Sequence, residues 1–117
     1  MQLKKGKYLA TFLAVVTFAV AMPVLAAEEV DAEAAEVLAR RENCLKCHAV
    51  DKAKDGPAYK KVAAKYKNKP DAEERLLKHL RSGSPVTLPS GEEEEHRIIK
   101  SKDDKEVMNL IRWILSQ

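Results

Sequence analysis

The sequence predicts an all-α domain of three to four helices, and two observations lead to this class. Apolar residues recur at helical spacing in several segments that follow residue 27. The strand signal is weak, because no segment alternates apolar and polar residues over a sustained run and β-branched residues are sparse after residue 27. No internal repeat, low-complexity linker or second domain is visible, so a single small domain is expected.

The first expected helix covers residues 28–43. Its early acidic residues suit the positive end of the helix dipole. Its expected apolar side consists of Val30, Ala34, Val37 and Leu38. A turn and a short helix are expected between Gly56 and Tyr66.

Capping-box patterns begin the two later helices. Asp71 with Glu74 begins a helix that runs to Arg81 and ends at Gly83, and Asp103 with Glu106 begins the last one. The apolar positions of these two helices are Leu76, Leu77 and Leu80 in the first, and Val107, Leu110, Ile111, Ile114 and Leu115 in the second. Residues 82–102 are expected to form a long loop, with one helical turn near the glutamates at 92–95.

The N-terminal segment has the pattern of a secretory signal peptide. Three lysines at positions 4, 5 and 7 precede an uncharged apolar stretch, and small residues follow Pro23. We predict cleavage after Ala26, which gives a signal peptide of residues 1–26 and a domain of residues 27–117. An uncleaved membrane anchor is the alternative. Without the leader the chain carries 18 basic and 18 acidic residues, so no nucleic-acid partner is indicated.

The motif with the most chemical information is Cys44-Leu45-Lys46-Cys47-His48, the Cys-x-x-Cys-His attachment signature of a c-type haem. Two thiols at this spacing can add to the two vinyl groups of one porphyrin, and the adjacent histidine becomes the proximal iron ligand. A thioredoxin-like pair would need a βαβ pattern, which is absent from the sequence. A zinc site would need four ligands, and the other histidines, His79 and His96, are too scattered for one.

Few large apolar side chains are available to the predicted domain, whose aromatic residues are Tyr59, Tyr66 and Trp113. A domain this small usually needs an additional stabilising element, such as a disulfide or a bound metal ion. A covalently held porphyrin would supply one, and we therefore expect the chain without haem to be poorly folded.

The chain resembles the class I c-type cytochromes of bacteria over the whole of residues 27–117. The segments that carry the resemblance are residues 43–48, 56–66, 80–84 and 110–116. It implies the cytochrome c fold, with one haem c bound through Cys44 and Cys47 and His48 as proximal ligand. It also implies that the Pro57 carbonyl accepts a hydrogen bond from the His48 ring. In this resemblance Trp113 and Leu110 would pack the last helix across the first, near Ala35 and Leu38, and Ile111 and Ile114 would face the haem.

The sixth iron ligand is where the sequence departs from most of this family, because the loop of residues 82–102 contains no methionine. His96 is the favoured candidate, since it lies in this loop 48 residues after His48 and 17 before Trp113. Met108 lies within the last expected helix, where a core role is the simpler interpretation. His79 is expected on the surface, and water or no ligand stays possible.

These features predict a periplasmic one-electron carrier rather than an enzyme. Two imidazole ligands would give a low-spin haem of low potential. The family resemblance further implies a likeness to the periplasmic shuttles of iron-oxidising or metal-respiring bacteria. The alternatives are a haem sensor or peroxidase-like protein with a displaceable sixth ligand, and a non-haem metal module. We expect a monomer without a membrane span after cleavage. Eight lysines between positions 46 and 69 could guide acidic redox partners to the haem edge.

Overall fold

The structure is a computed structural model that describes residues 18–22 and 28–117. Most of the expected signal peptide, including its cleavage site after Ala26, lies outside the described residues and stays a prediction. The described part of it, residues 18–22, is exposed. No helix in the two described ranges is long and apolar enough to span a membrane.

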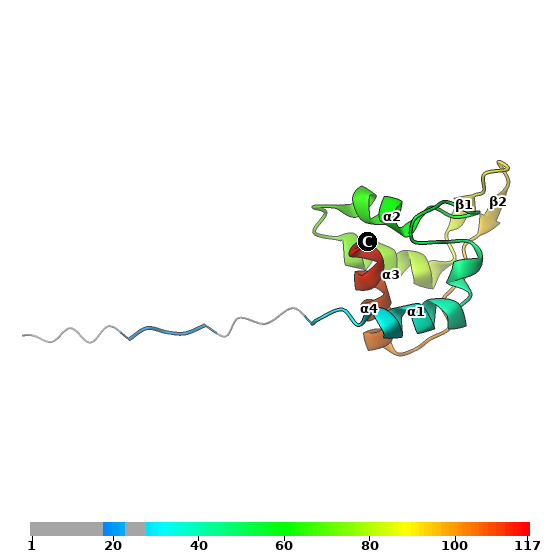
Figure 1. Ribbon diagram of the computed structural model, residues 1–117. Coiled ribbons are helices and arrows are strands. Elements are labelled where there is room, and N and C mark those ends of the chain that lie inside the picture. The colour runs from blue at the N-terminus through cyan, green and yellow to red at the C-terminus, as the bar shows by residue number, and fades with distance from the viewer. Residues whose placement is uncertain (1–17, 23–27) are drawn as a thin grey trace, which may run out of the picture.

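The fold is all-α except for one short hairpin, which confirms the predicted class (Figure 1). The helices are α1 (Ala32–Arg41), α2 (Tyr59–Tyr66), α3 (Ala72–Ser82) and α4 (Asp104–Leu115), with a short 3₁₀ turn η1 (Cys44–Lys46) after α1. The hairpin consists of β1 (Pro85–Thr87) and β2 (Glu93–Glu95).

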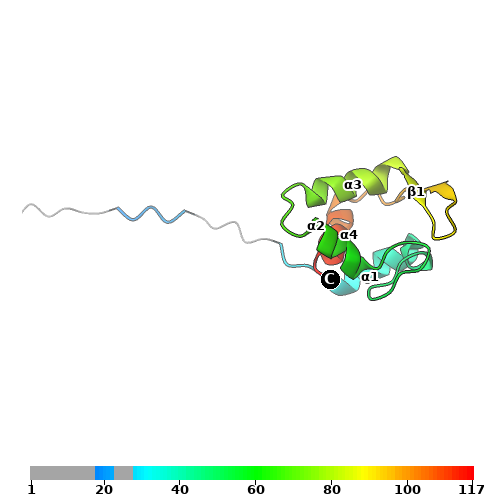
Figure 2. The same cartoon turned by 90° about the horizontal axis from the view of Figure 1, so that it is seen from above.

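Helix α4 is the centre of the domain. It contacts each of the other three helices, and Figure 2 shows α1 and α3 on opposite sides of it. The Asp103 side chain accepts hydrogen bonds from the backbone N–H groups of Lys105 and Glu106, which satisfies donors that a helix start leaves free. The predicted apolar stripe is confirmed, because four of its five residues are buried and Leu115 is partly buried.

Helix α1 differs from the expectation in both extent and orientation. It begins at Ala32 rather than residue 28, because the Asp31 side chain caps it by accepting from the N–H of Ala34. The residues that α1 buries are Ala35, Leu38 and Ala39, whereas Val37 is 52% exposed. The predicted buried face of α1 was therefore wrong, and the true face is rotated from it by about one residue position. The small side chains of Ala35 and Ala39 let α1 lie close against α4.

The end of α3 is as predicted, and its start differs in detail. Gly83 follows the helix in the left-handed region (φ 62°), a conformation that glycine adopts without strain. Asp71 occupies the N-cap position, but its carboxylate accepts from the Arg75 guanidinium at 2.6 Å instead of capping the backbone.

The expected helical turn at the glutamates is wrong, because residues 93–95 form strand β2. Val86 of β1 lies opposite Glu94 in the antiparallel pair, and Gly91 (φ 90°) helps the chain to reverse. A helical turn would set Glu92 and Glu95 side by side, and like charges at this spacing destabilise a helix.

Candidate haem site

The Cys-x-x-Cys-His motif forms one compact turn directly after α1. Asn43 adopts the left-handed conformation (φ 60°) and redirects the chain. The Cys44 carbonyl then accepts from the N–H groups of Cys47 at 3.2 Å and His48 at 3.0 Å. Both thiols and the imidazole therefore project from a single turn, and neither cysteine is in a disulfide.

The His48 ring is oriented by the segment that follows it. Its Nδ1 atom lies 2.8 Å from the Pro57 carbonyl oxygen, which can only accept, so Nδ1 carries the proton and donates. Nε2 is then left with its lone pair available to a metal ion. The predicted hydrogen bond from His48 to Pro57 is thus present, and a carbonyl acceptor of this kind makes an imidazole a stronger ligand.

Gly56 lies directly against the His48 ring. A Cβ atom added at residue 56 would be 2.8 Å from Nδ1 and 2.9 Å from Nε2, and closer still to Cε1. The Gly56 N–H also donates to the Cys47 carbonyl at 2.7 Å, which holds this backbone against the motif. Sequence reasoning treated Gly56 only as part of a turn and missed its steric role, although its position before Pro57 was visible.

Two further aromatic rings support His48 from the core. The Tyr59 ring stacks on His48 with centroids 5.2 Å apart, and the Trp113 ring meets Tyr59 edge-on at 5.6 Å. Burial raises the pKa of the Tyr59 phenol well above its usual range, and the neighbouring Cys44 thiol adds to the shift. Burial likewise raises the pKa of the Cys44 thiol, and repulsion from the Glu42 carboxylate is a second, smaller cause of the increase.

His96 lies directly after β2. Its backbone N–H donates to the Ser84 carbonyl at 3.1 Å, which fixes the residue next to the end of α3. Its Nδ1 atom lies 3.0 Å from the Arg97 carbonyl oxygen and therefore donates, as Nδ1 of His48 does. Burial lowers the pKa of His96, which favours the neutral ring that can ligate a metal.

The ring centroids of His48 and His96 are 6.2 Å apart. Metal–imidazole bonds of about 2 Å, extended by the radius of each ring, would place two imidazoles that share one metal ion about 6 Å apart. Among the described residues no hydrogen bond reaches Nε2 of either ring. The spacing of the two rings is therefore compatible with imidazoles that share one haem iron.

His79, which was expected on the surface, is only partly exposed. Its ring lies 4.3 Å from the His96 ring, centroid to centroid. Burial lowers the pKa of His79, with a smaller effect from His48. The contact between His79 and His96 joins residues that are distant in the sequence, and it forms because hairpin β1–β2 brings His96 back onto α3. His79 is thus a neighbour of the site that sequence reasoning missed.

Met108 is partly buried and packs against the hydrophobic core from within α4. This agrees with the interpretation of Met108 as a core residue. The structure therefore brings together Cys44, Cys47, His48, Pro57 and His96, and it leaves Met108 in a helix.

The expected lysine-rich surface is present beside the motif, and all eight lysines between positions 46 and 69 are exposed. A shallow groove contains Lys52 and Lys54 together with His48 and Trp113. The Lys54 ammonium donates to the Leu45 carbonyl within the motif at 2.6 Å, and Lys60 pairs with Asp51.

Comparison with known proteins agrees with this geometry. The family model described as cytochrome c matches residues 32–117. This chain belongs to the cytochrome c family. Cytochrome c-551 of Pseudomonas aeruginosa is 36% identical over 91 residues, which cover 74% of this chain and 79% of that protein.

Two solved structures are similar as well. The class 1 cytochrome MtoD of Sideroxydans lithotrophicus ES-1 is 54% identical with a TM-score of 0.73, and the match covers 75% of this chain and 97% of that one. Cytochrome c552 of Nitrosomonas europaea is 32% identical with a TM-score of 0.57, and that match covers 69% and 96%. Family membership indicates that this cytochrome attaches haem c at Cys44 and Cys47 and carries electrons between redox partners.

Proposed function

We propose that this cytochrome is a periplasmic one-electron carrier in which His48 and His96 both ligate the haem iron. The observation that carries the proposal is the proximity of the two imidazoles, whose ring centroids are 6.2 Å apart and whose Nδ1 atoms each lie within hydrogen-bond distance of a backbone carbonyl. The export pattern of residues 1–26 supports the periplasmic location. Bound haem supplies an iron that cycles between the ferric and ferrous states.

The ligand pair bears on both the potential and the type of chemistry. A methionine ligand raises the potential of a haem, whereas a second imidazole favours ferric iron, so we propose a low-potential carrier. Two strong ligands also leave no open position for oxygen or peroxide. This argues for electron transfer over the peroxidase-like or sensor alternative.

Replacing His96 tests the ligand assignment. We expect the ferric His96→Ala protein to show a high-spin component in its optical and electron paramagnetic resonance spectra, because one ligand is lost. The matched control is His79→Ala, which removes the adjacent half-buried imidazole. We expect this control to stay low-spin. A low-spin His96→Ala protein would refute the assignment, and a high-spin His79→Ala protein would move it to His79.

We also propose that the lysine-rich surface guides acidic redox partners to the haem edge. Lys52 and Lys54 lie in the same groove as His48, which supports this location. Charge reversal at Lys52, Lys54 and Lys60 should slow electron exchange with an acidic partner most at low salt, because salt screens exposed charges over about 10 Å at 0.1 M. Lys105→Glu, on α4, is the control. Equal rates of electron exchange for the two variants would refute the proposal that the lysine-rich surface guides acidic partners.

A further inference from the structure

Glu42 is the one buried charged residue in the described part of the chain. It ends α1, two residues before Cys44, and is only 7% exposed. Burial of a carboxylate is costly unless its oxygens accept hydrogen bonds. The partners of this carboxylate therefore indicate why it is there.

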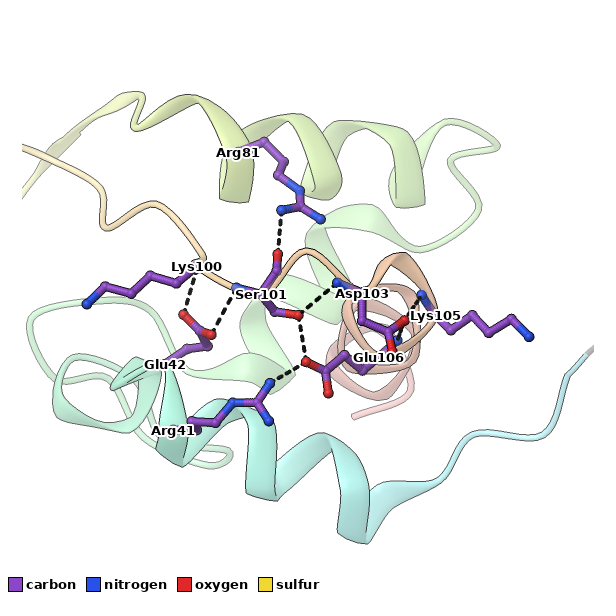
Figure 3. Close-up of polar contacts among 8 residues, drawn as sticks. All are labelled: Arg41, Glu42, Arg81, Lys100, Ser101, Asp103, Lys105 and Glu106. Carbon is purple, nitrogen blue, oxygen red and sulfur yellow. Dashed lines mark hydrogen bonds and ion pairs between the residues drawn. The ribbon is translucent and has the colours of Figure 1, made fainter.

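Both oxygens of Glu42 are satisfied by the segment that follows His96. Oε2 accepts from the backbone N–H of Lys100 at 2.8 Å, and Oε1 accepts from that of Ser101 at 3.1 Å (Figure 3). We call residues 96–101 the distal strap. Two consecutive N–H groups of the strap are thus directed at one carboxylate, and hydrogen bonds to a charged acceptor are stronger than neutral ones.

Other contacts complete the attachment of the strap. The Ile99 N–H donates to the Leu80 carbonyl at 2.9 Å, and the Ile99 side chain is buried. The Arg81 guanidinium donates to the Ser101 carbonyl at 2.6 Å. These bonds fix the strap to α3. The Glu42 carboxylate ties the strap directly to the segment that leads into the haem-attachment motif, and the neighbouring Arg41 is linked to Ser101 only indirectly, through Glu106.

The strap also controls the His96 ring, because Nδ1 donates to the carbonyl of Arg97, the next residue in the strap. Movement of the strap would therefore move both the backbone of His96 and the acceptor that orients its imidazole. We infer that Glu42 is a positioning residue for the distal iron ligand: it ties the strap that carries His96 to the haem-attachment segment. This inference rests on the proposed ligation by His96.

The test is the rate at which carbon monoxide binds the reduced holoprotein, which is limited by departure of the distal ligand. Glu42→Gln keeps the shape of the side chain, but its amide nitrogen is a donor and cannot accept from a strap N–H. Because a charge-assisted hydrogen bond is lost and a donor is left unpaired, we expect binding about tenfold faster or more. Glu42→Asp keeps the charge with a shorter reach and should give an intermediate rate.

The matched control is Asp31→Ala, at the other end of α1. It removes the hydrogen bond from the Ala34 N–H, an N-cap worth about 1 kcal/mol of stability, and does not touch the strap. We expect it to lower the melting temperature and leave the carbon monoxide rate unchanged. If both Glu42 variants lower the melting temperature but leave that rate at the wild-type value, Glu42 is merely structural and the inference is overturned.

His96→Ala in the same assay separates the two ideas. If it accelerates carbon monoxide binding and the Glu42 variants do not, only the positioning role fails. If it has no effect, the ligation by His96 fails, and the inference about Glu42 fails with it.

Discussion

Substitution of Gly56 by alanine should disturb the proximal histidine, and the size of the disturbance follows from the structure. The new Cβ atom would lie 2.8 Å from Nδ1 of His48. Ordinary contacts begin near 3.4 Å, so the ring would have to retreat by about 0.6 Å or more. Because Nδ1 of the same ring donates to the Pro57 carbonyl at 2.8 Å, this movement should disturb that hydrogen bond.

Two effects of Gly56→Ala are expected in the holoprotein. Overpacking of this kind costs about 1–3 kcal/mol, and each 1 kcal/mol lowers the melting temperature of a domain this size by about 4–8 °C. The loss of the carbonyl acceptor should also make His48 a weaker donor to iron, which changes the potential and the low-spin spectrum. Thermal unfolding, redox titration and electron paramagnetic resonance measure these effects.

Gly91→Ala is the control for Gly56→Ala. Gly91 has a positive φ of 90°, so alanine is strained there, but nothing lies within 4 Å of the added Cβ. It should lower stability by about 1–2 kcal/mol through the backbone and leave the haem spectrum unchanged. A Gly56→Ala protein with the wild-type potential and spectrum would refute the steric role of Gly56.

Three further predictions concern other parts of the molecule. Met108→Leu should leave the haem spectrum unchanged, because Met108 packs in the core; a changed ligand-field spectrum would make it an iron ligand. Asp103→Ala should lower stability by about 1 kcal/mol, since α4 loses its N-cap, and unchanged thermal unfolding would contradict this. The Cys44→Ala/Cys47→Ala chain, which cannot attach haem, should lack the cooperative unfolding and helical circular dichroism of the holoprotein; a native-like signal would mean that the apolar core suffices alone.

The sequence predicted best where a local signal and the tertiary packing agree. Helix α4 is an example, because its capping residue Asp103 and its apolar stripe specify the same helix and the same buried face. The haem-attachment turn from Cys44 to His48 was predictable for a related reason, since all residues of its signature are consecutive in the sequence.

Features that depend on distant residues could not be predicted in this way. Val37 is more hydrophobic than Ala35, yet close approach to α4 requires the smaller residue. The sequence around His79 gives no sign of its contact with His96, because hairpin β1–β2 creates that contact. The sequence around Glu42 does not show that this carboxylate is buried, because the backbone N–H groups that bind it belong to the distal strap.

The central claim is that His48 and His96 ligate the same iron, and spectra of the purified ferric holoprotein test it most directly. We predict a low-spin bis-imidazole signal in electron paramagnetic resonance and no methionine–iron charge-transfer band in the optical spectrum. A methionine band, or a predominantly high-spin spectrum, would contradict the claim.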